Sequence, residues 1–171
     1  TDADFNTALG YHALSSDTKG SRATAIGQGA LFSQNFTSAT NNYNTAVGYA
    51  AGVNVTTGVE NNLIGGLAGD ALTVGSYNQV LGVAALSADT KGSRSIAIGH
   101  AALLSQNFTT ATDAYNVAIG HNTGLSVSTG IQNTLIGGLA GDALTDADYN
   151  VALGYLALST DTLGSRSIAI G

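Results

Sequence analysis

The chain repeats the pentapeptide NTALG, first found at residues 6–10, ten times in related forms that end with SIAIG at residues 167–171. The glycines that close the pentapeptides follow a 17-residue period, as from Gly10 to Gly27, except for two spacings of 21. These glycines are Gly10, Gly27, Gly48, Gly65, Gly82, Gly99, Gly120, Gly137, Gly154 and Gly171. A fixed period with one strand-like motif per unit is typical of a solenoid, in which each unit buries its apolar side against its neighbours.

Three of the shorter units and one of the longer units together form a long repeat. Residues 1–72 and 73–144 are two copies of it, and residues 145–171 are part of a third. No linker, charge block or change of composition interrupts the series, so we predict a single repetitive segment over residues 1–171. Because the third copy is incomplete, we expect the chain to belong to a longer repetitive protein.

The composition excludes several classes of partner. The chain carries 11 Asp and Glu, only 5 Lys and Arg, and a net charge of −6. This balance argues against nucleic acid and against an anionic membrane surface as partners. The absence of Cys excludes a disulfide scaffold and a Cys-ligated metal site. No apolar run approaches the ~18 residues of a membrane-spanning helix, so we expect no membrane insertion of this segment.

Both central positions of the pentapeptide are apolar. Position 4 is always aliphatic, and position 3 is Ala in seven units. Consecutive strand residues face opposite sides of a sheet, so both sides of this one are apolar. We predict that position 4 fills the solenoid interior and that the small position-3 side is the face of a homo-oligomer; the alternative is an Ala-rich face exposed to water. The predicted oligomer face is Ala8, Ala25, Ala46, Leu63, Val80, Ala97, Ala118, Leu135, Ala152 and Ala169.

Two other columns indicate polar ladders along the solenoid axis. Position 1 is Asn in seven units, namely Asn6, Asn44, Asn61, Asn78, Asn116, Asn133 and Asn150. Position 13 carries Thr18, Asn35, Thr56, Thr73, Thr90, Asn107, Ser128, Thr145 and Thr162. Parallel in-register strands space such side chains by roughly 4.8 Å, at which distance amides can hydrogen-bond along the axis. We therefore interpret the Asn column as structural rather than as a ligand-binding array.

A further column, directly before each pentapeptide, alternates between aromatic and other residues. It consists of Phe5, Arg22, Tyr43, Glu60, Tyr77, Arg94, Tyr115, Gln132, Tyr149 and Arg166. Each Arg is next to an aromatic residue, an order that stacking of guanidinium groups on ring faces explains, at about 0.5–1 kcal/mol per exposed contact. The alternative is a carbohydrate-binding aromatic strip, which Arg and Glu would interrupt at every second unit.

The two longer units differ from the others in one place, where a short turn is extended to residues 36–43 and 108–115. Insertions in solenoids gather on one side, which is often the binding side. We predict two partner-binding loops about 19 Å apart along the axis; the alternative is a longer turn without a partner. The candidate residues are Phe36, Thr37, Thr40, Asn41, Asn42, Tyr43, Phe108, Thr109, Thr112, Asp113 and Tyr115.

No motif indicates a catalytic, cofactor or metal site. The segment GGLAGDAL at 65–72 and its copy at 137–144 resemble a calcium-binding nonapeptide, but that site needs tandem copies that share each ion. His100 and His121 occupy the same position of adjacent units with no carboxylate beside them in that column, so we expect surface or interface histidines rather than metal ligands. We expect no enzymatic activity and no cofactor.

The motifs NTAVG at 44–48 and SIAIG at 95–99 resemble the head repeats of YadA-like trimeric autotransporter adhesins. The pattern of residues 6–18 is also similar to repeats of phage tail fibres. The resemblance implies a left-handed parallel β-roll, three chains side by side, and attachment to host matrix or cells. The adhesin repeat is shorter than the repeat of this chain, so this coil needs longer turns or another cross-section. We expect no membrane anchor, coiled-coil stalk or fibre-tip domain within this segment.

Together, these features predict an all-β fold, a parallel β-solenoid of about ten rungs and roughly 45 Å in length. We expect a stiff structural or adhesive segment of an extracellular fibre, on a cell surface or in a virion tail fibre. Its expected partners are identical chains in a trimer and a protein or glycan of the host surface.

Two other functions remain open at this point. An ice- or crystal-surface-binding solenoid is favoured by the position-13 column and by small polar residues at position 11, although charges at Asp17, Lys19, Asp89 and Lys91 interrupt a flat hydroxyl surface. A polysaccharide-active solenoid is favoured less, because it needs clustered carboxylates and the acidic residues here are scattered over turns.

Overall fold

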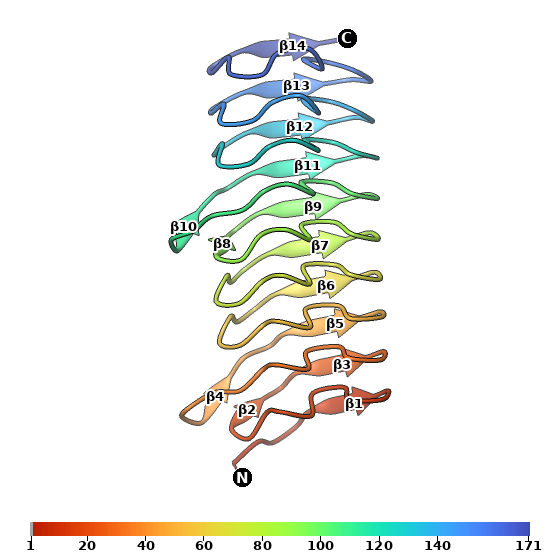
Figure 1. Cartoon of the computed structure of the whole chain (residues 1–171), viewed down its shortest axis with the longest axis vertical. Coiled ribbons are helices and arrows are strands. Elements are labelled where there is room, and N and C mark those ends of the chain that lie inside the picture. The colour runs from red at the N-terminus through yellow and green to blue at the C-terminus, as the bar shows by residue number, and fades with distance from the viewer. Residues whose placement is uncertain (1) are drawn as a thin grey trace.

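The computed structural model describes residues 2–171 as a solenoid of strands and tight turns, with no helix in that range. Figure 1 shows the coils stacked in one column, with the N-terminus at one end and the C-terminus at the other. The predicted all-β parallel solenoid is therefore confirmed. Each repeat unit, shorter or longer, is one coil, which we call a rung.

One three-residue strand from each rung contributes to a ten-stranded parallel sheet. In spatial order the strands are β1 (Thr7–Leu9), β3 (Thr24–Ile26), β5 (Thr45–Val47), β6 (Asn62–Ile64), β7 (Gln79–Leu81), β9 (Ile96–Ile98), β11 (Val117–Ile119), β12 (Thr134–Ile136), β13 (Val151–Leu153) and β14 (Ile168–Ile170). The register is constant, so that Ala25 pairs with Ala8 on one side and with Ala46 on the other. Each position of the repeat therefore forms a straight column along the axis.

The two longer rungs add two small sheets. Strand β4 (Thr40–Asn41) pairs with β2 (Gly20–Ser21), and β10 (Thr112–Asp113) pairs with β8 (Gly92–Ser93). Figure 1 shows all four on the same side of the stack, beside the main sheet. The inserted residues thus extend one turn sideways and leave the register of the main sheet unchanged.

The invariant glycine at position 5 has a steric cause. The closing glycines from Gly10 to Gly154 have φ between 126° and 145°, a region that favours glycine. A Cβ added at Gly48 would lie 2.5 Å from the carbonyl oxygen of Gly65 in the next rung. Any other residue would push the rungs apart at the end of each strand.

The interior of the coil is narrow, and large side chains enter it from the strand or from the return segment. The fully buried Leu63 projects inward from β6, and the return segments around it carry glycine: a Cβ added at Gly52 or Gly69 would lie 2.6 or 2.9 Å from a Leu63 methyl carbon. Where the strand carries Ala25, the return segment supplies the buried Leu31 instead. Volume is thus matched across the coil, as close packing of an interior requires.

This packing corrects one prediction from the sequence. The position-3 side chains lie inside the coil, and from Ala25 to Ala152 each is at most 2% exposed: Ala25, Ala46, Leu63, Val80, Ala97, Ala118, Leu135 and Ala152. Ala8 and Ala169 occupy the same column in the two terminal strands, where Ala8 is exposed and Ala169 is half-buried. The prediction that position 3 forms the oligomer face was wrong, because a narrow interior selects small side chains. The aliphatic side chains of position 4 point outward.

Candidate functional site

Positions 2 and 4 of the ten strands form an open surface, which we call the outer sheet face. Position 4 contributes Leu9, Ile26, Val47, Ile64, Leu81, Ile98, Ile119, Ile136, Leu153 and Ile170, and position 2 contributes Thr7, Thr24, Thr45, Asn62, Gln79, Ile96, Val117, Thr134, Val151 and Ile168. Six of the position-4 side chains are exposed, with values of 39% for Ile64 and 50% for Leu81, and the other four are partly exposed. An apolar strip therefore runs the length of the solenoid.

The two halves of the outer sheet face differ in polarity. Position 2 is polar through the first five strands and mostly aliphatic in the last five. At the end of the polar half, Asn62 donates a hydrogen bond to the side-chain oxygen of Gln79 over 2.6 Å. A shallow depression of about 240 Å³ lies beside this pair, lined by Asn62, Ile64, Gln79, Val80, Leu81 and Ile98. A partner on this face would meet the aliphatic position-4 column throughout. Beside it, the position-2 column is polar as far as the Asn62–Gln79 pair, which forms a polar step before the aliphatic half.

His100 and His121 follow β9 and β11 at neighbouring positions along the axis. Their rings stack at a centroid distance of 5.2 Å and an interplanar angle of 12°. Within residues 2–171, no group of three or more His, Cys, Asp or Glu side chains is placed to hold a metal ion. The pair is thus an aromatic stack on the surface.

The segments 65–72 and 137–144, which resemble a calcium-binding nonapeptide, each contain one half-buried carboxylate, that of Asp70 or Asp142. Burial raises the pKa of Asp70, with backbone hydrogen bonds acting in the opposite direction. One carboxylate oxygen of Asp70, and the same atom of Asp142, is buried without a hydrogen-bond partner in the described chain. At Asp70, desolvation therefore outweighs the backbone hydrogen bonds that favour the ionised carboxylate.

The structure divides the predicted loop residues into exposed and buried groups. Thr37, Asn41, Tyr43, Thr109, Asp113 and Tyr115 are exposed, and Thr40 and Thr112 are partly exposed. Phe36 and Phe108 are only 6% exposed, and Asn42 is fully buried. The prediction that these last three contact a partner was wrong, because they pack inside and hold the longer turns against the coil.

Further contacts fix the longer turns in place. The Lys91 ammonium group donates to the carbonyl oxygen of Thr109, as Lys19 does to Thr37. The buried carboxylate of Asp89 accepts hydrogen bonds from the backbone of Gly92 and Phe108 and from the Gln106 side chain. The exposed residues of both loops are therefore displayed on a rigid support rather than on free segments.

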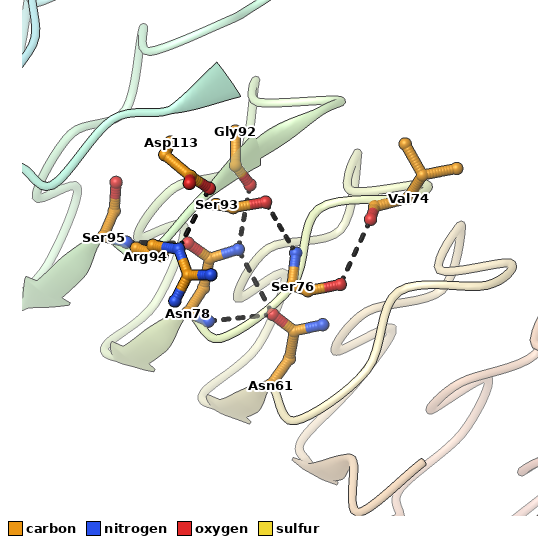
Figure 2. Close-up of polar contacts among 9 residues, drawn as sticks. All are labelled: Asn61, Val74, Ser76, Asn78, Gly92, Ser93, Arg94, Ser95 and Asp113. Atoms are coloured by element: carbon orange, nitrogen blue, oxygen red, sulfur yellow. Dashed lines mark hydrogen bonds and ion pairs between the residues drawn. The ribbon is translucent and has the colours of Figure 1, made fainter. Parts of the chain in front are cut away.

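The Asn column is the ladder that the sequence predicted. Figure 2 shows the side-chain oxygen of Asn61 accepting from the backbone and side-chain nitrogens of Asn78, at 3.0 and 3.2 Å. Asn78 also donates to the carbonyl oxygen of Gly92 and accepts from the backbone of Ser95. Each Asn thus connects the strand to the next return turn as well as to its neighbour in the column.

Two glutamines complete this ladder, and the sequence reasoning did not identify them. Where the column is interrupted by Ser95, the buried Gln106 donates to the Ser95 hydroxyl and accepts from Asn116 at 2.8 Å. Where the column is interrupted by Ala23, the side-chain oxygen of Gln34 accepts a hydrogen bond from the Asn44 side chain in the same way. A sequence pattern could have identified them. Gln occupies position 12 only in the longer rungs, and these rungs also lack Asn at position 1.

The position-13 column also forms the predicted ladder. The hydroxyl of Thr56 donates to the carbonyl oxygen of Thr73, and that of Thr73 donates to Thr90. Thr145 makes the same contact with Thr162. These hydroxyl protons are engaged within the coil, which weighs against an ice-binding surface built on them.

We call the residues that precede the pentapeptides the turn column, and its stacking is confirmed. The guanidinium carbon of Arg94 lies 4.6 Å from the Tyr77 ring centroid and 5.8 Å from that of Tyr115. Arg94 also pairs with Asp113 at 3.1 Å, as Figure 2 shows, and this contact raises the pKa of Arg94. Arg166 lies 5.1 Å from the Tyr149 ring centroid.

Comparison with protein-family models, curated proteins and solved structures gives no match for this chain. Within residues 2–171, no helix is long and apolar enough to cross a membrane. The outer sheet face, the longer turns and the turn column are therefore the features from which function is inferred.

Proposed function

We propose that this chain is a rigid structural and adhesive segment of an extracellular fibre, of a cell surface or a virion tail, assembled from identical chains through the outer sheet face. The observation that carries the proposal is the open aliphatic strip along ten strands. The whole outer sheet face is about 45 Å long and about 10 Å wide, or roughly 450 Å², and the aliphatic side chains of positions 4 and 2 form its larger part. This area lies within the range of the largest apolar patches of monomeric proteins, which are often functional.

Association of copies through this face is supported by its shape and chemistry. The position-4 column is aliphatic in every strand and the strands are in register, so a second copy presents the same strip over the same length. Burying apolar surface contributes about 25 cal/mol per Å². We take three copies as the stoichiometry because the pentapeptides resemble those of trimeric adhesins; three strips then meet around a common axis.

The adhesive part of the proposal is carried by the longer turns. Thr37 and Asn41 are exposed in one loop, and Thr109 and Asp113 are exposed in the other. Both loops are held to the coil and recur every four rungs, about 19 Å apart. Several weak contacts at fixed spacing give avidity that no single contact provides. The proposed partner is a protein or glycan of a host surface.

A cross-linking experiment tests the proposed assembly. The chain has no Cys, so Leu81→Cys introduces one thiol on the outer sheet face. A short bis-maleimide is expected to link this variant into dimers at low protein concentration. The matched control is Ser105→Cys, an exposed position outside this face, which is expected to stay unlinked. Equal linking of both variants, or linking of the control alone, would contradict the proposed interface.

A cell-binding measurement tests the proposed adhesion. Fluorescent beads coated with the protein are expected to bind host cells, and changing Thr37, Asn41, Thr109 and Asp113 together to Ala is expected to reduce binding at least fivefold. The control variant carries Ala at Ser33, Ser105, Thr57 and Thr129, which lie in other turns. Undiminished binding of the loop variant would refute the assignment of adhesion to these loops.

A further inference from the structure

The turn column contains two rungs in which the place of an Arg is taken by another residue. Arg22, Arg94 and Arg166 alternate with aromatic rings, but Glu60 follows Tyr43 and Gln132 follows Tyr115. Glu60 and Gln132 have the same backbone conformation, with φ of 56°. The Arg residues adopt the same left-handed region, so the column is continuous and only its side chains change.

The Arg rungs show what the spacing of the rings accommodates. Arg22 lies 5.0 Å from the Phe5 ring centroid and 5.9 Å from that of Tyr43. Arg94 is held between Tyr77 and Tyr115 in the same way. Two rings of the column that are two rungs apart are therefore separated by roughly 10 Å. One planar guanidinium group fits between them, with cation–π attraction to both rings.

In the rung of Glu60, the same place in the column carries a carboxylate on a shorter side chain instead of a cation. Tyr43 and Tyr77 flank it along the column and are 52% and 40% exposed. Arg22 contacts Tyr43, and Arg94 contacts Tyr77, each from the rung on the far side of the ring from Glu60. The ring faces toward Glu60 therefore have no Arg against them. Glu60 is exposed. Within residues 2–171, Glu60 makes no ion pair with Lys or Arg; the ion pair found there joins Arg94 and Asp113.

We propose that Glu60, Tyr43 and Tyr77 form a binding site for a guanidinium group, supplied by an exposed Arg side chain of a partner protein. The carboxylate accepts two parallel hydrogen bonds from the guanidinium fork, and the planar group lies between the two rings. The fork geometry and the stacking both favour Arg over Lys. The net charge of −6 favours approach of a basic partner surface. The site is formed by one chain and does not depend on the proposed assembly.

The second long repeat contains a matched control. Gln132 lies between Tyr115 and Tyr149, which are exposed to a similar degree as the rings around Glu60. It offers an amide in place of the carboxylate and therefore lacks the negative charge. We expect the first site to bind a guanidinium ligand and the second to bind it about fivefold more weakly, the equivalent of ~1 kcal/mol for an exposed ion pair.

The test uses the whole chain with isotope-labelled tyrosine rings. N-acetyl-arginine amide is added stepwise, and the tyrosine signals are followed by NMR. The seven tyrosine signals are assigned with single Tyr→Phe variants. The expected result is a saturable shift of the Tyr43 and Tyr77 signals in the millimolar range. Glu60→Gln should weaken this response about fivefold without changing the thermal unfolding midpoint, since the same residue is accommodated at 132. Gln132→Glu should add an equal response from Tyr115 and Tyr149.

Two further ligands make the result decisive. N-acetyl-citrulline amide has nearly the same shape without the charge and is expected to give no saturable shift. N-acetyl-lysine amide is expected to bind more weakly than the arginine ligand. The proposal is overturned if Glu60→Gln responds like the unchanged chain, if citrulline binds equally, if lysine binds more tightly, or if only other tyrosines shift.

Discussion

Positions 3 and 4 of the ten-stranded sheet are both apolar in sequence, but they lie on opposite faces and differ in environment. Leu63 projects inward from β6 and is fully buried, while the next residue, Ile64, projects outward and is partly exposed. The inner face is closed by the return segments of the same chain. The outer face also carries an aliphatic column, at position 4, and in our proposal this face is closed by other copies. Hydrophobicity alone therefore does not tell which face of a narrow solenoid is the interior.

The largest expected difference between the faces comes from the adjacent pair Leu63 and Ile64. Leu63→Ala removes a fully buried side chain whose space the neighbouring glycines cannot refill, and we expect a loss of about 3 kcal/mol in the free energy of unfolding. The measurement is denaturant unfolding followed by circular dichroism.

Ile64→Ala is the control for that prediction. We expect it to cost less than about 1 kcal/mol in a dilute, unassembled chain, because the side chain is already partly in water. Its effect should grow with protein concentration if the outer face is an interface, since assembly stabilises only the folded chain. Equal costs for the two variants at high dilution would remove the distinction between the faces.

A second adjacent pair, Asn61 and Asn62, compares polar residues on the two faces. Asn61→Ala leaves the buried carbonyl of Gly75 and the backbone nitrogen of Asn78 without their partners, and we expect a loss of about 2 kcal/mol. Asn62→Ala removes only the contact with Gln79 on the outer face and should change stability by less than about 0.5 kcal/mol in the dilute chain. Thermal unfolding of both variants measures the difference, and a larger loss for Asn62→Ala would contradict it.

A charge on the outer face should abolish assembly with little effect on the coil. Leu81 lies in the middle of the strip and is half exposed, so Leu81→Lys is expected to fold with an unchanged circular dichroism spectrum and to sediment as a single chain. Three lysines brought together in an apolar interface would remain unpaired, which is strongly unfavourable. Ser105→Lys, outside this face, should assemble like the unchanged chain. Assembly of Leu81→Lys in normal yield would contradict the proposed interface.

The smallest expected effect concerns the polar step on the outer face. Gln79→Ile gives β7 the residue that Ile96 supplies in the next strand, and so extends the aliphatic half of the strip by one strand. We expect the dissociation constant of the assembly to fall severalfold, while the unfolding midpoint of the dilute chain stays the same. Analytical ultracentrifugation over a dilution series measures this change. Weaker assembly would show that the Asn62–Gln79 pair favours the interface.

The repeat period was sufficient to predict the fold. The regular spacing of the closing glycines, 17 residues except for two spacings of 21, predicted parallel in-register strands, and with them the Asn column and the Arg stacking in the turn column. These predictions succeed because a solenoid returns the chain to the same point of the coil once per repeat unit, so neighbours along the axis are known from the register alone.

The identity of the interior face could not be predicted from alternation, because positions 3 and 4 are both apolar. The deciding feature was size matching across the coil: Gly52 and Gly69 lie opposite Leu63, whereas Ala25 is matched by Leu31. The prediction of partner-binding residues in the longer turns was only partly compatible with the structure, for a related reason. Their length predicted projecting loops, but the sequence did not distinguish the buried anchor Phe36 from the exposed Thr37 beside it.

The measurement that tests the central claim most directly is the solution mass of the chain by light scattering after size-exclusion chromatography, with Leu81→Lys run beside it. The proposed assembly predicts the mass of three chains for the unchanged protein and of one folded chain for the variant. A folded single chain at every concentration of the unchanged protein would contradict the claim that the outer sheet face joins identical copies.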